Sequence, residues 1–352
     1  MVIELNKTRF KILNNLLDIK GENLSISELT KSIKKKYGSG NYSLINEELH
    51  KMADEKLVYL EKIGHTLVPK LNFDNQNLIT LLVKIELDNK LDLLNKFPQL
   101  QPIISLIENN CQKLHYIHSI SIINAKQNKK LNRVELLIIF RPKELDENWD
   151  YNHDLHLRKE KEKIKRILQS LGTKYNIRID YLILDRAEYL ELVQSDEINQ
   201  VGDMLKTKIV IFRPQIFWFE YKDIIDNYFK NLKLYNKKET ETNPSFISEQ
   251  ELTYNLARFG YIEFGSNTIQ TDNISIEYII TAILIRNDIR KLESIPIIIL
   301  KNMNSIHIEL LKFLCIKYGV LDKLLYIIKT MKYNNLEKLE LYNVLSSSTE
   351  SE

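Results

Sequence analysis

The chain has 352 residues, of which 44% are hydrophobic and 28% are charged, and its formal net charge is +3. This length has room for two or three domains with a sizeable core, and the composition is ordinary for a globular protein. So small a net charge excludes a strongly basic field. Residues 1–72 nevertheless hold twelve Lys or Arg against nine Asp or Glu, a basic bias at one end that is compatible with nucleic acid.

The two cysteines, Cys111 and Cys315, lie far apart in the chain. They form no disulfide framework, and this usage is typical of a reducing cytoplasm. The longest apolar runs are too short to span a bilayer. The first ten residues contain an acid and no long apolar core, so we expect no secretory signal. The sequence therefore predicts a cytoplasmic protein without a membrane segment.

Residues 7–19, 25–37 and 42–56 each carry apolar side chains at helical spacing. Ser25 and Glu28 form the sequence pattern of a capping box at the start of the second helix, and Asn41 is the expected cap of the third. Two β-like runs follow at 57–61 and 66–71, joined by four residues that include Gly64. The pattern predicts three helices and then a β-hairpin.

This order resembles a winged helix-turn-helix domain, and residues 52–58 (MADEKLV) resemble the end of a recognition helix that leads into the wing. The resemblance covers residues 5–73, within a domain expected at 1–73. It implies that the third helix enters the major groove of double-stranded DNA, with its early residues at base edges and nearby lysines on phosphates. The residues expected to contact DNA are Lys31, Lys34, Lys35, Lys36, Asn41, Tyr42, Ser43, Asn46, His50 and Lys62.

A protein-binding role for the same helices is the alternative. Glu47 and Glu48 lie on the candidate recognition helix, where carboxylates would repel phosphate. A lysine run at a helix end also complements the helix dipole without any ligand. The competing interpretation is an antitoxin-like module that binds a protein partner.

Residues 74–112 read as a connector of two helices. Cys111, His115 and His118 follow one another at a spacing seen in metal sites, and His153 and His156 come later. Zinc needs four ligands that converge tetrahedrally. A cysteine on a helix and a histidine on a strand are poorly placed for this, so no metal site is predicted.

Residues 113–236 are expected to form a mixed α/β domain. The runs 117–123 (IHSISII), 134–140 (VELLIIF) and 177–184 (IRIDYLIL) have the length and isoleucine content of buried strands. Residues 155–171 place apolar side chains on one stripe among Lys and Glu, which indicates an amphipathic helix laid on the sheet.

This order resembles the nucleotidyltransferase superfamily, in particular its small archaeal and bacterial members. In that family a Gly-Ser pair ends the first strand, an acid-x-acid triplet lies on the second, and a third acid lies on a later strand. The aligned positions here are Asn124 with Ala125, Arg133 to Glu135, and Asp180. Glu188 with Tyr189, and then residues 206–217, also resemble the tail of that domain.

Departures from the pattern decide the expected chemistry. Nucleotide transfer needs carboxylates that converge on a divalent metal. Arg133 places a fixed cation where the first acid would stand, so Asp180 is expected to pair with Arg133 or Arg178, and the domain is expected to be inactive and to hold no cofactor. The alternative is a divergent nucleotidyltransferase in which Glu135 and Asp180 bind magnesium.

The polar residues 237–244 mark a boundary, and helical patterns fill residues 245–345. They indicate a packing or oligomerisation bundle, followed by a disordered tail at 346–352. The predicted fold is therefore an α+β multidomain chain with an N-terminal winged helix, a nucleotidyltransferase-like mixed sheet and a C-terminal helical bundle. The expected function is DNA-binding regulation, with double-stranded DNA as partner and a homodimer as the binding form.

Overall fold

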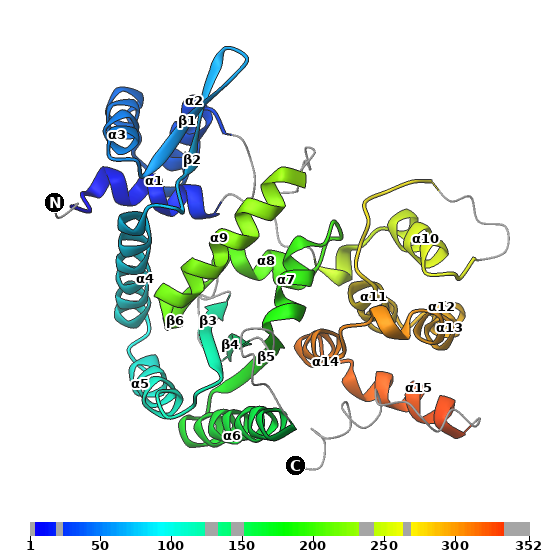
Figure 1. Ribbon diagram of the computed structural model, residues 1–352. Helices are drawn as coiled ribbons and strands as arrows, with labels where there is room; N and C mark the ends of the chain where they lie inside the picture. Colours follow the sequence, from blue (N-terminus) through cyan, green and yellow to red (C-terminus); the bar gives the residue numbers. More distant parts are fainter. Residues whose placement is uncertain are drawn as a thin grey trace. The chain divides into compact units, whose positions relative to one another are not determined.

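The computed structural model describes residues 4–18, 24–123, 133–141, 151–231, 243–262 and 269–333 (Figure 1). The chain divides into two compact units, and each is made of two chain segments. The first unit is Met1–Ile179 with Met204–Lys237, and the second is Asp180–Asp203 with Lys238–Glu352. In its described residues the protein is mixed α/β and mostly helical, with two small sheets, which agrees with the expected α+β class.

The first unit begins with the three helices and the hairpin expected from the sequence. They are α1 (Lys7–Asp18), α2 (Ile26–Tyr37), α3 (Tyr42–Asp54), β1 (Val58–Ile63) and β2 (Thr66–Leu71). The strands pair antiparallel, with Ile63 opposite Thr66 at the turn, and Gly64 takes the positive φ of 60° that this turn needs. Apolar side chains from all three helices form the small core, namely Ile12, Leu13, Leu29, Ile33, Leu49 and Met52.

Two connector helices follow, α4 (Gln76–Lys96) and α5 (Leu100–Cys111). α4 packs against β6 (Ile209–Phe212) and α9 (Pro214–Asn231), far along the sequence. The buried carboxylate of Glu86 accepts a hydrogen bond from the backbone N–H of Val210 at 2.9 Å. The buried Lys208 ammonium lies 3.9 Å from Glu86 and 4.4 Å from the centre of the Trp218 ring. This contact ties the connector to the central sheet.

The central sheet has the strand order β5-β4-β3-β6. Its strands are β3 (Ile117–Ile123), β4 (Arg133–Phe140), β5 (Arg178–Asp185) and β6, and the pairs β3–β4 and β3–β6 are antiparallel. In Figure 1, α9 is drawn above the strands and α6 (Tyr151–Tyr175) below them, and α9 packs against β3 and β6. The expected strands and the amphipathic helix are present, and the four residues of β6 lie within the segment 206–217.

Apart from residues 180–185 of β5, the second unit is mostly helical in the described residues. Its helices are α7 (Arg186–Gln194), the first half of α8 (Gln200–Thr207), α10 (Glu249–Arg258), α11 (Ile276–Arg286), α12 (Ile289–Leu292), α13 (Ser294–Lys301), α14 (Ile308–Lys317) and α15 (Leu321–Tyr333), with 3₁₀ turns at Pro244–Phe246 and Met303–Ser305. α11 is buried along most of its length and packs against α14. The carboxylate of Glu277 accepts a hydrogen bond from the backbone N–H of His307 at 2.8 Å, which joins the starts of these two helices.

Within the part of the chain that the structure describes, no helix combines the length and the apolar character needed to cross a membrane. Of the predicted boundary at 237–244, residues 237–242 lie outside the described residues, as does the predicted tail at 346–352.

Candidate nucleic-acid interface

Local capping fixes where α2 and α3 begin and end. Ser25 and Glu28 form the expected capping box, with each side chain bonded to the backbone N–H of the other residue. Gly38 ends α2 with a left-handed φ of 69°. Asn41 caps α3, and its side-chain oxygen accepts from the N–H groups of Ser43 and Leu44 at 2.9 and 3.4 Å. The oxygen of Asn41 is therefore occupied, and its amide nitrogen is the end available to a ligand.

Gly40 brings the start of α3 against α2. A Cβ placed on Gly40 would lie 3.0 Å from the carbonyl oxygen of Thr30 and 3.2 Å from the Cβ of Lys34. Only glycine fits such a close approach without a shift of one of the two helices. Lys34 and the first residues of α3 therefore belong to one surface.

Only three of the four lysines of α2 share that surface. Lys31, Lys34 and Lys35 are exposed and, at spacings of three and four residues, lie on neighbouring positions of one side of the helix. Lys36 is also exposed but points toward α1, because its ammonium lies 5.4 Å from the centre of the Tyr37 ring and 3.4 Å from the carbonyl oxygen of Asn14. The structure thus brings three of the four predicted lysines together and separates Lys36 from them.

The outward face of α3 carries most of the predicted base-reading residues. Asn41, Tyr42, Ser43 and His50 are exposed, and Asn46 is half-buried. The opposite face, with Ile45, Leu49 and Met52, is buried in the core. The helix is therefore amphipathic in the sense that the prediction requires.

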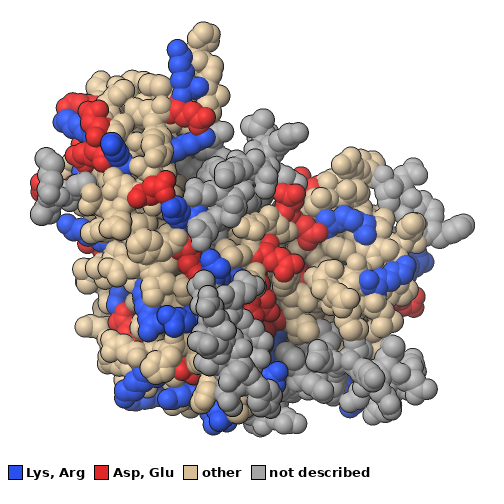
Figure 2. Space-filling model, viewed as in Figure 1, with Lys and Arg blue, Asp and Glu red and all other residues tan. Residues whose placement is uncertain are grey.

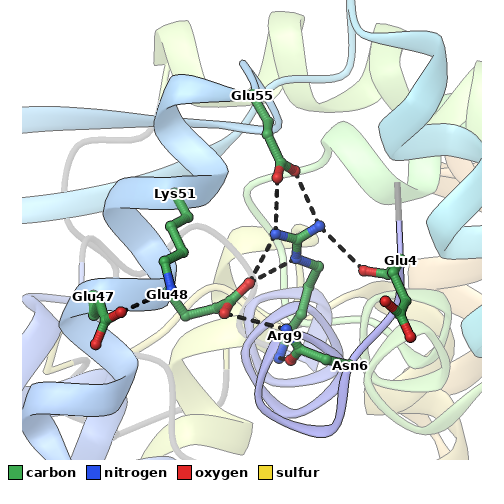
Figure 3. A network of polar contacts seen from close by, with 7 residues as sticks. All are labelled: Glu4, Asn6, Arg9, Glu47, Glu48, Lys51 and Glu55. Carbon is green, nitrogen blue, oxygen red and sulfur yellow. Dashed lines mark hydrogen bonds and ion pairs between the residues drawn. The ribbon is translucent and has the colours of Figure 1, made fainter. Parts of the chain in front are cut away.

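The two glutamates of α3 have different environments, which the sequence interpretation did not distinguish. Glu48 is turned inward and bonds to the buried guanidinium of Arg9, with the Arg9 Nε and Nη2 atoms both 2.8 Å from its Oε1 (Figure 3). Glu55 lies 3.0 Å from Arg9 Nη1, and Asn6 donates to Glu48 at 3.2 Å. Glu48 therefore holds α1 to α3 and does not face a ligand.

Glu47 remains on the outward face, where it pairs with Lys51 one turn later at 2.7 Å. This hydrogen bond holds the pKa of the Glu47 carboxyl below its ordinary value, so the group is ionised and its charge is compensated locally. Figure 2 shows acidic and basic side chains interspersed over the visible face of these N-terminal elements. Of the two glutamates expected to repel DNA phosphates, only Glu47 therefore lies on the outward face, and Lys51 compensates its charge.

The hairpin extends beyond the helices with exposed polar and apolar side chains near its turn. Lys62 and His65 are exposed, and Ile63 and Leu67 flank them. Lys70 and Glu61 form an ion pair across the two strands. Lys70 is thus neutralised by Glu61, whereas Lys62 at the tip of the hairpin is exposed to a ligand.

No protein-family model, curated protein or solved structure significantly matches this chain. The interface is therefore judged on its geometry alone.

The central sheet places the second set of predicted residues. Glu135 is buried on β4, and the guanidinium of Arg133 lies 3.3 Å from its carboxylate. Asp180 is buried on β5, which neighbours β4 in the strand order. The aligned pair Asn124 and Ala125 lies outside the described residues. A fixed cation this close to Glu135 opposes the binding of a divalent metal there.

The residues at a metal-like spacing in the sequence have different environments. Cys111 ends α5 and is buried, which raises the pKa of its thiol to about 12. His118 lies on β3 and pairs with Glu220 of α9 at 3.0 Å, and His115 and His156 are exposed. Among the described residues no three His, Cys, Asp or Glu side chains are grouped so as to hold a metal ion, and the side chain of His153 lies outside them.

Proposed function

We propose that the chain is a DNA-binding regulatory protein, in which α1–α3 and the β1–β2 hairpin act as a winged helix-turn-helix. The observation that carries this proposal is the close approach at Gly40, which joins the Lys31, Lys34 and Lys35 side of α2 to the exposed start of α3. Phosphate contacts from such lysines would set the register of the protein on a duplex. Tyr42, Ser43, Asn46 and His50 would then face base edges in the major groove.

The internal position of Glu48 supports the same proposal. A carboxylate that faced the duplex would oppose the phosphates, and the Arg9 contact removes one of the two glutamates of α3 from that face. Glu47 keeps its charge but is compensated by Lys51. A carboxylate at this place can also accept a hydrogen bond from the amino group of cytosine.

For the central sheet we propose a scaffold without catalytic chemistry. This rests on the contact between Arg133 and Glu135, which leaves a cation beside the carboxylate that a nucleotidyltransferase would use for magnesium. Magnesium-dependent nucleotide transfer by the purified chain, abolished by Glu135→Ala, would establish the enzyme instead.

Binding to duplex DNA as a function of salt tests the main proposal. Changing Lys31, Lys34 and Lys35 to Gln should weaken binding to every sequence, and the salt dependence should flatten by about 0.9 in slope for each phosphate that is no longer neutralised. The matched control changes three exposed basic residues of α6, namely Lys159, Lys163 and Arg166, and removes the same charge. A triple α2 variant that binds like the parent would remove this surface from the proposal.

A sharper comparison uses neighbouring lysines. Lys34→Gln should weaken DNA binding clearly more than Lys36→Gln, because Lys34 borders α3 whereas Lys36 is turned toward α1. Equal effects would show that only the overall charge matters. A co-purifying protein together with no DNA affinity would favour the protein-binding alternative.

A further inference from the structure

Helix α4 carries apolar side chains on two opposite sides. One side is buried in the first unit and includes Leu78, Leu81, Leu82 and Ile85. On the other side, Leu87 and Leu91 remain 50% and 57% exposed, one turn apart. Half-buried Val83 and Leu94 extend this row in both directions, and we call these four residues the outer stripe of α4. A surface helix of a monomeric protein is normally polar on this side.

The outer stripe differs from scattered exposed residues such as Ile289 or Tyr326. Isolated exposed apolar residues are common on protein surfaces and need no partner. Four residues spaced by three or four positions instead form a continuous ridge along one helix. Figure 1 shows α9 and β6 on one side of α4 and no element on the other. Within the described chain, the ridge is therefore open to a partner.

We propose that the outer stripe of α4 binds the outer stripe of a second copy of this chain, with the two helices parallel about a two-fold axis. Ridges of residues four apart pack into the grooves between the same ridges on a neighbouring helix. A stripe of this kind is thus complementary to itself, as a two-fold interface requires.

The charges beside the stripe favour this partner and this orientation. Asp88 and Asp92 lie on one side of it together with the exposed Lys84, so that this side keeps one net negative charge, and Lys90 lies on the other. In a parallel two-fold pair the acidic side of each helix faces Lys90 of the partner subunit, whereas an antiparallel pair would bring the two acidic sides together. Lys90 also contacts Glu108 of its own chain at 2.5 Å, with 17% of its side chain exposed at the helix border.

The parallel arrangement deepens the proposed function and, in this respect, rests on it. α4 is fixed to the end of α3, because the Asn75 side chain donates to the carbonyl oxygens of Glu55 and Lys56 at 3.1 and 3.0 Å. Parallel α4 helices therefore place both copies of α3 at the same end of the dimer. Two half-sites on one duplex require this placement.

Light scattering after size exclusion, over a range of concentrations, tests the dimer with the full chain. The parent should approach twice the chain mass of 41.7 kDa. Leu87→Gln with Leu91→Gln should raise the dissociation constant by at least ~100-fold, because the variant no longer buries these large apolar side chains in the dimer. Glutamine is a good helix former, and unchanged circular dichroism will show that the variant folds. Ile289→Gln with Tyr326→Gln is the matched control and should leave the dimer intact.

Cysteine cross-linking tests the orientation. Both native cysteines are buried, whereas a cysteine introduced by Leu87→Cys would be exposed and available for oxidation. A parallel pair sets residue 87 opposite itself, and mild oxidation should give a disulfide-linked dimer that Tyr326→Cys does not give. A monomeric parent, or a dimer that the double glutamine variant leaves unchanged, overturns the inference. A dimer without the cross-link overturns the parallel arrangement. A parent dimer that depends on Leu87 and Leu91 but binds no DNA leaves the inference standing and removes the proposed function.

Discussion

Replacement of Arg9 by Leu offers the most direct test of the contact between α1 and α3. Glu48 keeps only 10% of its side chain exposed and accepts from Arg9 at 2.8 Å, so it cannot regain water when the guanidinium is removed. Leaving one charge of a buried pair without its partner costs about 3–5 kcal/mol. Glu55 is 33% exposed and can turn to solvent, so its contact adds little to this figure. The expected destabilisation is therefore about 3 kcal/mol or more, roughly 150-fold in the local unfolding equilibrium.

Hydrogen exchange of backbone amides in α1 and α3 measures this destabilisation within the full chain, where the two compact units need not unfold together. The double variant Arg9→Leu with Glu48→Leu provides the control, because replacing both partners of a buried ion pair by apolar groups is often neutral. It should recover most of the protection from exchange. A single variant within about 1 kcal/mol of the parent, or a double variant no better than the single one, would refute the reasoning about Glu48.

Three further outcomes are expected. Gly40→Ala should destabilise the α2–α3 pair by about 1–3 kcal/mol and weaken DNA binding, because the new Cβ would lie 3.0 Å from the Thr30 carbonyl oxygen. Gly64→Ala is the control: there is open space around Gly64, so this change should cost only the strain of its positive φ. Thermal melting and DNA titration compare the two variants. Burial raises the pKa of Glu277, so the folded protein holds this proton more tightly than the unfolded chain and stability should fall as pH rises through that raised pKa; Glu277→Gln should remove this part of the pH dependence in urea titrations. Cys111 and Cys315 are buried with pKa values raised to about 12, so a thiol reagent at pH 8 should label neither until denaturant is added.

Local patterns in the sequence were sufficient to predict α1 to α6 and β1 to β4 of the first unit, whereas its helix α9 was not predicted. Ser25 with Glu28 indicated the start of α2, and the apolar runs at 117–123 and 134–140 became β3 and β4. These signals depend on neighbours within a few residues, which the sequence shows directly.

Contacts between distant segments were beyond such patterns. Arg9 and Glu48 are 39 residues apart, and Glu86 meets Val210 across 124 residues. One signal was nevertheless present. Glu48 shares the spacing of Ile45, Leu49 and Met52, the buried stripe of α3, so its inward position could have been inferred from helical geometry. The same geometry separates Lys36 from Lys34 on α2.

The sequence indicated which residues of the candidate site would be exposed, but not which of them would share one surface. Nine of the ten predicted DNA-binding residues are exposed, and Asn46 is half-buried. Which lysines share a surface with α3 depends on the turn at Gly40, whose close approach to Thr30 follows from the packing of two helices. The prediction that these residues bind DNA awaits the titrations proposed above.

The joining of α4 to β6 has a consequence for how the protein is made. The first unit is completed only by Met204–Lys237, because β6 borders β3 and Glu86 bonds to the backbone of Val210. A ribosome delivers the chain from its N-terminus. During translation the contacts of β6 with α4 and β3 therefore form only after residue 212 has emerged from the exit tunnel.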